Sequence, residues 1–314
     1  ESKGIGTRAG DMAAPLTIFF FSLYLLVLLV GILGDGFIAG LLGSVWVRRR
    51  KLPPCDMIVA SLGTSRFFLL LLSMLNGICI LVSPRPYYSP FLFYCMFFWD
   101  LLNLFSFWFA AGLSVFYCVK ITTFTHPFFL WLKQKISGMV PWFLIGSILV
   151  SCVSTFPFII HNSANSTWCN NSGNRTEVDW KTFQSLKVLV MIFIPMSVPV
   201  LLLLISSILL ATSLRRHLRA MQHHGPGLQD CSTKAHRRAL ASLTSLLSFY
   251  VWYFISLVLT SAFTIPFDSS WIWLVQLATF LGTTCHPLLL TWNNPKIRRA
   301  LERRLHHISA CQTP

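Results

Sequence analysis

The chain has 314 residues, of which 54% are hydrophobic and only 11% are charged. Soluble domains carry about 25% charged residues, so this composition does not fit one water-soluble core. The formal net charge of +15 does not indicate a nucleic-acid partner, because the basic residues lie in short connections between apolar runs. The composition therefore predicts a protein whose solvent is the lipid bilayer.

Seven apolar runs follow one another, each long enough for a helix to cross the hydrocarbon with some tilt, which takes about 20 residues. In chain order they cover residues 16–46, 55–82, 90–119, 138–160, 183–214, 240–263 and 271–292. We therefore predict an all-α membrane protein, a seven-transmembrane-helix bundle at residues 12–294, multi-pass in the plasma membrane. Residues 1–11, which precede Met12, are expected to be a non-native or disordered extension.

The distribution of Lys and Arg predicts the orientation, because cytoplasmic loops carry the excess of both. Most of them follow the first, third, fifth and seventh runs. The N-terminus is therefore expected outside. The loop between the fourth and fifth runs carries three glycosylation sequons, which agree with an outer position, beginning at Asn165, Asn170 and Asn174. Residues 295–314 are predicted to form a short amphipathic C-terminal helix and tail on the inner leaflet.

Three ionisable side chains stand out within the runs, namely Asp35, Arg66 and Asp100. Such groups are costly in the membrane and usually face the bundle interior. Asp35 and Arg66 lie at similar depth in the first and second runs, so we predict a structural intramembrane pair. A proton-relay role is the alternative. Asp100 is the acid of the outer half and is able to attract cationic agonists, or alternatively to bond to the fourth helix.

Trp99, Asn103 and Phe107 are spaced four residues apart, so they share one face of the third helix. From spacing alone, ordinary helix packing remains the alternative to a binding role.

The sequence gives little support for a catalytic or metal-binding motif. The nine cysteines include no CxxC pair and no ligand spacing with histidine, so we expect no metal and no cofactor. An intramembrane serine protease would have to use Ser65 and His286, but Ser65 lacks a GxSG turn. A secondary transporter would show internal repeats and broken helices. The chain is expected not to be an enzyme.

Several long motifs resemble the taste receptor type 2 family of bitter receptors, and within it the subgroup of members forty-one and sixty. They are WFAAGLSVFYCVKITTFTHPFFLWLK (108–133), SLRRHLRAMQHH (213–224), KAHRRALASLTS (234–245), SLGTSRF in the second run and HPLLLTWNNPKIRRA from His286. The resemblance runs from Met12 to nearly the end of the chain. It implies a G-protein-coupled receptor for small bitter agonists that activates a gustducin-like heterotrimeric G protein. A pheromone-type chemoreceptor of related architecture is the alternative.

The resemblance also implies functional positions. The agonist contacts of the family map onto Asn76, Trp99, Asn103, Tyr253 and Gln276, and Asp100 and Phe107 complete the set we predict. An aromatic wall with a few amides suits small ligands of varied shape. The G-protein face maps onto Tyr117, Lys120, Leu214, His217 and His236. Anionic lipid would select a similar basic and aromatic surface.

Two departures from the family pattern matter. Asp35 stands where the family usually has Asn, which places a negative charge beside Arg66. Gln276 stands where several members have Glu, so an acid-dependent agonist contact does not carry over to this chain.

Overall fold

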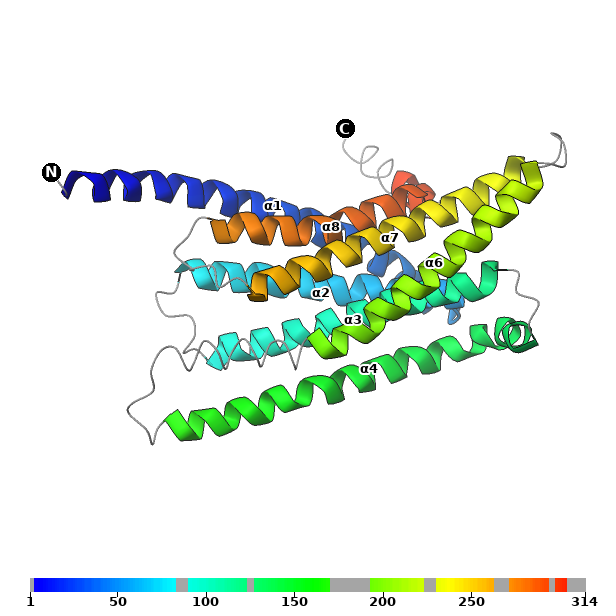
Figure 1. Ribbon diagram of the computed structural model, residues 1–314, viewed down its shortest axis with the longest axis horizontal. Coiled ribbons are helices and arrows are strands. Elements are labelled where there is room, and N and C mark those ends of the chain that lie inside the picture. Colours follow the sequence, from blue (N-terminus) through cyan, green and yellow to red (C-terminus); the bar gives the residue numbers. More distant parts are fainter. Residues whose placement is uncertain are drawn as a thin grey trace.

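The computed structural model describes residues 3–82, 90–122, 127–169, 193–222, 230–262, 271–293 and 297–303. Within these ranges every regular element is helical and no residue lies in a strand. The helices are α1 (Lys3–Arg49), α2 (Pro54–Val82), α3 (Pro90–Ile121), α4 (Pro127–Cys169), α6 (Ile194–Gln222), α7 (Asp230–Ala262) and α8 (Trp271–Asn293). They run lengthwise beside one another as a bundle (Figure 1). Residues 297–303 add a short helical stretch after α8.

Six of these helices contain a stretch that is long and apolar enough to cross a membrane. In α7 the apolar stretch among the described residues, Thr244–Thr260, is shorter. Large apolar side chains are exposed on the outside of the bundle, such as Trp142 at 74% and Val153 at 73% on α4. Water would not support such a surface, whereas lipid does. The predicted all-α membrane architecture is confirmed.

Some predicted boundaries differ from the structure. Helix α4 extends beyond the predicted run 138–160 at both ends, so Asn165 lies within the helix, with its side chain outside the described set. Asn170 and Asn174 lie outside the described residues. Helix α1 begins at Lys3, within the segment predicted to be an extension, and the side chains before Pro15 are not described. The glycosylation sites and the foreign origin of residues 1–11 stay predictions.

A tight connection joins α1 to α2. Arg50 has a positive φ of 53°, and its N–H donates to the carbonyl of Trp46 at 2.8 Å, which closes the last turn of α1. Helix α2 then begins at Pro54, because proline has no N–H to lose at the first helical position. Asp56 lies in the first turn, where the helix dipole favours a carboxylate.

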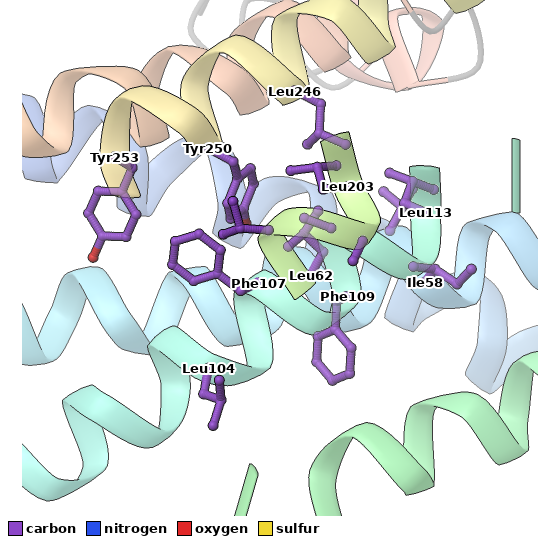
Figure 2. Close-up of a cluster of buried hydrophobic side chains, with 14 of the residues drawn as sticks. Ile58, Leu62, Leu104, Phe107, Phe109, Leu113, Leu203, Leu246, Tyr250 and Tyr253 are labelled. Carbon is purple, nitrogen blue, oxygen red and sulfur yellow. The ribbon is translucent and has the colours of Figure 1, made fainter. Parts of the chain in front are cut away.

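The core of the bundle lies around α3, which contacts α2, α4, α6 and α7. Helix α1 packs against α2 and α8, and α7 packs against α6 and α8, which closes the bundle. Phe107 of α3 is fully buried between Tyr250 and Tyr253 of α7, whose rings descend toward it in Figure 2. Leu203 of α6 adds to the same cluster. Helix α3 is therefore the central element that positions the predicted site.

Candidate functional site

A cavity of about 100 Å³ lies between α2, α3 and α8, at the end of the bundle opposite the basic connections. We call it the outer cavity. Its lining combines aromatic rings with a few polar side chains, namely Tyr24, Ser73, Asn76, Gly77, Ile80, Met96, Trp99, Ile272, Trp273, Gln276 and Phe280. Such a lining offers broad apolar burial with a few orienting hydrogen bonds, as small-molecule sites do.

The Trp99 indole is held in place by α2. Its Nε1–H donates to Ser73 Oγ at 2.9 Å, and Ser73 Oγ–H donates to the Leu69 carbonyl at 2.8 Å. The Tyr24 hydroxyl of α1 donates to the Ser73 carbonyl at 2.9 Å. One serine therefore connects the aromatic side chains of two other helices. Gly77 lies one turn further along α2, where a Cβ would come within 2.9 Å of the Tyr24 ring. The close approach of that ring depends on glycine.

Beneath the cavity, Asn103 joins α3 to α7. The Tyr253 hydroxyl donates to Asn103 Oδ1 at 2.5 Å, and Asn103 Nδ2 donates to the Trp99 carbonyl at 3.1 Å. Asn103 and Tyr253 are both almost completely buried, and Phe107 stacks on the Tyr253 ring with centroids 5.8 Å apart. These three residues do not line the outer cavity. The structure thus separates the predicted set into a lining and a layer below it.

The remaining predicted ligand positions are also divided. Asn76 and Gln276 line the outer cavity from α2 and α8, and Asn76 Nδ2 lies 3.6 Å from the Met96 sulfur. Asp100 is buried at 9% exposure on α3 and is not among the cavity-lining residues. A direct ion pair between Asp100 and a ligand in this cavity would therefore require a change of conformation.

Asp35 and Arg66 lie together inside the bundle. Arg66 Nε is 3.4 Å from Asp35 Oδ2, with both side chains nearly unexposed. Arg66 Nη1 is also 2.9 Å from His286 Nδ1 of α8. A guanidinium has only donors, so Nδ1 accepts this hydrogen bond and the ring proton is on Nε2. The cluster therefore connects α1, α2 and α8.

Ser65 does not pair with His286 as a serine protease would require. Its hydroxyl donates to the Leu62 carbonyl and lies 3.1 Å from Ser106 Oγ, and it forms no hydrogen bond with His286 among the described residues.

On the inner side, Tyr117 and Lys120 form contacts that stabilise the helix ends. Cys55 Sγ lies 3.2 Å from the Tyr117 hydroxyl, and Lys120 Nζ donates to the Lys133 carbonyl at 3.2 Å. Leu214 and His217 lie in α6 and His236 lies in α7, but their side chains are outside the described set.

Sequence reasoning missed the contribution of Tyr24, Ser73 and Trp273 to the cavity. The Trp273 and Tyr24 rings have centroids 5.6 Å apart. The spacing of Ser73, Asn76 and Gly77 places all three on one face of α2, and this spacing could have indicated that Ser73 lies beside Asn76 in the site. The aromatic partners from α1 and α8 had no such signal, because their proximity depends on how the helices pack.

The hydroxyl of Tyr253 provides a local test. Replacing Tyr253 by phenylalanine is expected to destabilise the bundle by about 1 kcal/mol, because Asn103 Oδ1 loses its donor. This corresponds to a fall of about 2–4 °C in the apparent Tm of the purified protein. Tyr94→Phe is the control, because the Tyr94 side chain is 58% exposed and lies outside the buried layer formed by Asn103 and Tyr253. Equal shifts in the two variants would argue against the importance of the Asn103 bond.

The fold and site together define a class. A bundle of membrane-length helices, with a buried polar core and a partly polar cavity at the end opposite its basic face, is the architecture of a multi-pass membrane protein. The sequence profile of the family described as "Taste receptor protein (TAS2R)" matches residues 12–309. The chain therefore belongs to the taste receptor type 2 family, whose members are receptors.

Individual relatives agree with this assignment over almost their whole length. The chain is 38% identical over 307 residues to taste receptor type 2 member 41 of Mus musculus and 40% identical over 308 residues to that of Pan troglodytes, each covering 94% of this chain and 97% of the relative. It is 37% identical over 319 residues to member 60 of Macaca mulatta, covering 99% of this chain and 98% of the relative. The predicted resemblance to this family is confirmed, and it decides against the pheromone-type alternative.

Proposed function

We propose that this receptor binds small bitter compounds in and above the outer cavity and, in response, activates a gustducin-type heterotrimeric G protein. The observation that carries the proposal is the meeting of Trp99, Asn76 and Gln276 around one cavity. These residues come from three helices, so a ligand among them contacts α2, α3 and α8 together. Membership of the taste receptor type 2 family supports the same function.

The size of the cavity indicates how an agonist acts. At about 100 Å³ it holds several waters, but it is small beside the roughly 300–1,000 Å³ of typical ligand sites. A larger agonist therefore extends above the cavity or displaces lining side chains, of which Trp99 is the largest that α3 contributes. Displacement breaks the Trp99–Ser73 hydrogen bond. An agonist consequently favours a bundle conformation different from this one, which is a population shift.

The contacts below the cavity provide a route to the inner face. The Trp99 carbonyl accepts from Asn103, and Asn103 accepts from Tyr253, so a shift of the outer part of α3 alters its link to α7. In this proposal the inner ends of α3, α6 and α7 separate, and a G-protein helix docks there. Tyr117 and Lys120 are the described members of that docking face.

A cell assay tests the ligand site. The receptor is expressed with a chimeric G protein that carries a gustducin-type tail, and calcium is recorded over a bitter panel. Asn76→Ala and Gln276→Ala are expected to shift agonist EC50 upward by about tenfold or more, since losing about 1.4 kcal/mol of contact is tenfold in affinity. Phe98→Ala is the matched control, because Phe98 is 49% exposed and does not line the cavity. Surface expression of each variant is measured in parallel.

Two outcomes would contradict the proposal. Unchanged EC50 values in both cavity variants at normal surface expression would exclude the outer cavity as the agonist site. A response that persists when the gustducin-type tail is replaced by the tail of an unrelated G protein would remove the proposed coupling preference.

A further inference from the structure

A second hollow lies at the opposite end of the bundle. It has a volume of about 860 Å³ and lies between the end of α1, the connection 51–53, the start of α2 and the helical stretch 297–303. We call it the inner groove. One wall is apolar and includes Leu41, Leu42 and Val45 of α1. The hollow is far larger than the outer cavity.

Helix periodicity explains how the groove acquires its two chemical faces. Leu41, Val45 and Arg49 are four residues apart on α1, so an apolar strip leads directly to a guanidinium. On the other side Ile297, Ala300 and Arg303 are three residues apart and share one face of the 297–303 stretch. In each wall the apolar lining residues come earlier in the chain and the basic residue comes last.

The opposite face of the 297–303 stretch is chemically separate. Arg298 Nε lies 2.9 Å from Glu302 Oε1, and the Arg298 guanidinium lies 5.3 Å from the Trp292 ring centroid. Neither Arg298 nor Glu302 lines the groove. The acid nearest to Arg303 in sequence is thus already paired, and Arg303 remains available to a ligand in the groove.

The charge of the groove is positive. Arg49, Lys51 and Arg303 line it, all three are exposed, and none forms an ion pair within the described part of the chain. The acid in the lining is Asp56, whose position in the first turn of α2 is explained by the helix dipole. Three cations and one carboxylate leave an excess of two positive charges facing one hollow.

Exposed tryptophans place the groove at the membrane surface. Trp46 of α1 is 58% exposed and Trp292 of α8 is 72% exposed. Tryptophan side chains outside a bundle concentrate at the level of the lipid headgroups. Arg49 lies one turn beyond Trp46, and Arg298 lies over Trp292, so the basic rim is at the depth of the lipid phosphates.

We propose that the inner groove binds one inner-leaflet phospholipid with a multiply phosphorylated headgroup, of the phosphoinositide class. The phosphates contact Arg49, Lys51 and Arg303, and an acyl chain follows the wall formed by Leu41, Leu42 and Val45. Guanidinium groups bind phosphate with paired hydrogen bonds, and three cations around one hollow suit a headgroup with more than one phosphate. The bound lipid would tie the stretch 297–303 to the ends of α1 and α2.

The apolar wall distinguishes a lipid from other anionic occupants. A soluble phosphate compound would use the three cations and leave the leucine-rich wall unused. An acidic peptide would gain no specific advantage from a groove whose apolar strip continues along α1 toward the hydrocarbon. The following experiment distinguishes a bound lipid from these two other occupants.

Native mass spectrometry of the purified full chain in detergent tests the proposal. The receptor is titrated with short-chain phosphatidylinositol bisphosphate, phosphatidylserine and phosphatidylcholine. We expect a single adduct of phosphatidylinositol bisphosphate at concentrations about tenfold or more below those needed for phosphatidylserine. The variant R49Q/K51Q/R303Q should raise the concentration needed by about a hundredfold, because each of the three basic residues near an anionic lipid surface contributes about fivefold in affinity.

Two further variants make the result specific. R48Q/R216Q/R299Q removes the same charge at exposed residues outside the groove, and it is expected to change the titration less than about threefold. Ala300→Phe keeps every charge and fills the groove, so it should weaken the adduct as strongly as the triple variant. If R49Q/K51Q/R303Q fails to fold, Ala300→Phe carries the test.

The proposal is overturned by any of three results. Equal losses in the two triple variants would indicate a diffuse basic surface. Competition by soluble inositol trisphosphate with the same potency as the intact lipid would indicate a site for a free phosphate compound. An undiminished adduct in Ala300→Phe would place the lipid elsewhere.

Discussion

Replacing Arg66 by methionine is expected to destabilise the receptor by about 3–5 kcal/mol and to abolish most of its surface expression. The substitution leaves the Asp35 carboxylate, which is 2% exposed, without its cation in the interior of the bundle. It also removes the donor to His286 Nδ1. The loss is measured as the apparent Tm of purified protein and as the surface fraction of tagged receptor in cells.

Removing both charges should restore much of this loss. Asp35→Leu with Arg66→Met eliminates the uncompensated charge, and apolar replacement of a whole buried pair is often neutral. A double variant no more stable than Arg66→Met alone would show that the two residues do not act as a pair.

The second large effect is expected at the contact between α3 and α4. A Cβ at Gly112 would overlap the ring of Phe143, so Gly112→Ala should cost about 1–3 kcal/mol through overpacking. The ring must move or α4 must shift away from α3. Because α3 carries Trp99 and Asn103, a shift of its backbone should also lower agonist potency in the calcium assay.

Two companion variants separate steric overlap from helix propensity. Gly146→Ala on α4 is the matched control, since a Cβ there meets nothing within 4 Å and alanine is the better helix former. Combining Gly112→Ala with Phe143→Leu should recover most of the lost stability. An apparent Tm that falls equally for Gly112→Ala and Gly146→Ala would refute the steric explanation.

The number of helices was predictable because each crossing must bury about 20 apolar residues, and such runs are visible without any tertiary information. Helix ends were less predictable. Helix α4 reaches from Pro127 to Cys169, beyond its predicted run 138–160, because polar residues continue a helix outside the hydrocarbon. An apolar run therefore predicts the membrane-embedded part of a helix and not its full length.

The candidate site was predictable only in part. The spacing of Trp99 and Asn103 predicts a shared face of α3, which is correct, yet the two have different partners. Trp99 lines the outer cavity and bonds to Ser73, whereas Asn103 lies below it and bonds to Tyr253. Residue spacing reports the direction of a side chain from its own helix but not which neighbouring side chain it meets.

The sequence by itself determined the solvent of this protein, the number of its crossings and the family to which it belongs. It also indicated that Asp35 and Arg66 would lie close together, because a charge within a membrane span requires a partner. Only the tertiary structure decided that His286 completes this cluster from 220 residues away, and that Tyr24, Ser73 and Trp273 close the outer cavity. The tertiary structure also formed the inner groove, because its two walls come from opposite ends of the chain. Local periodicity fixes which face a residue occupies, but the packing of one helix against another fixes its partners.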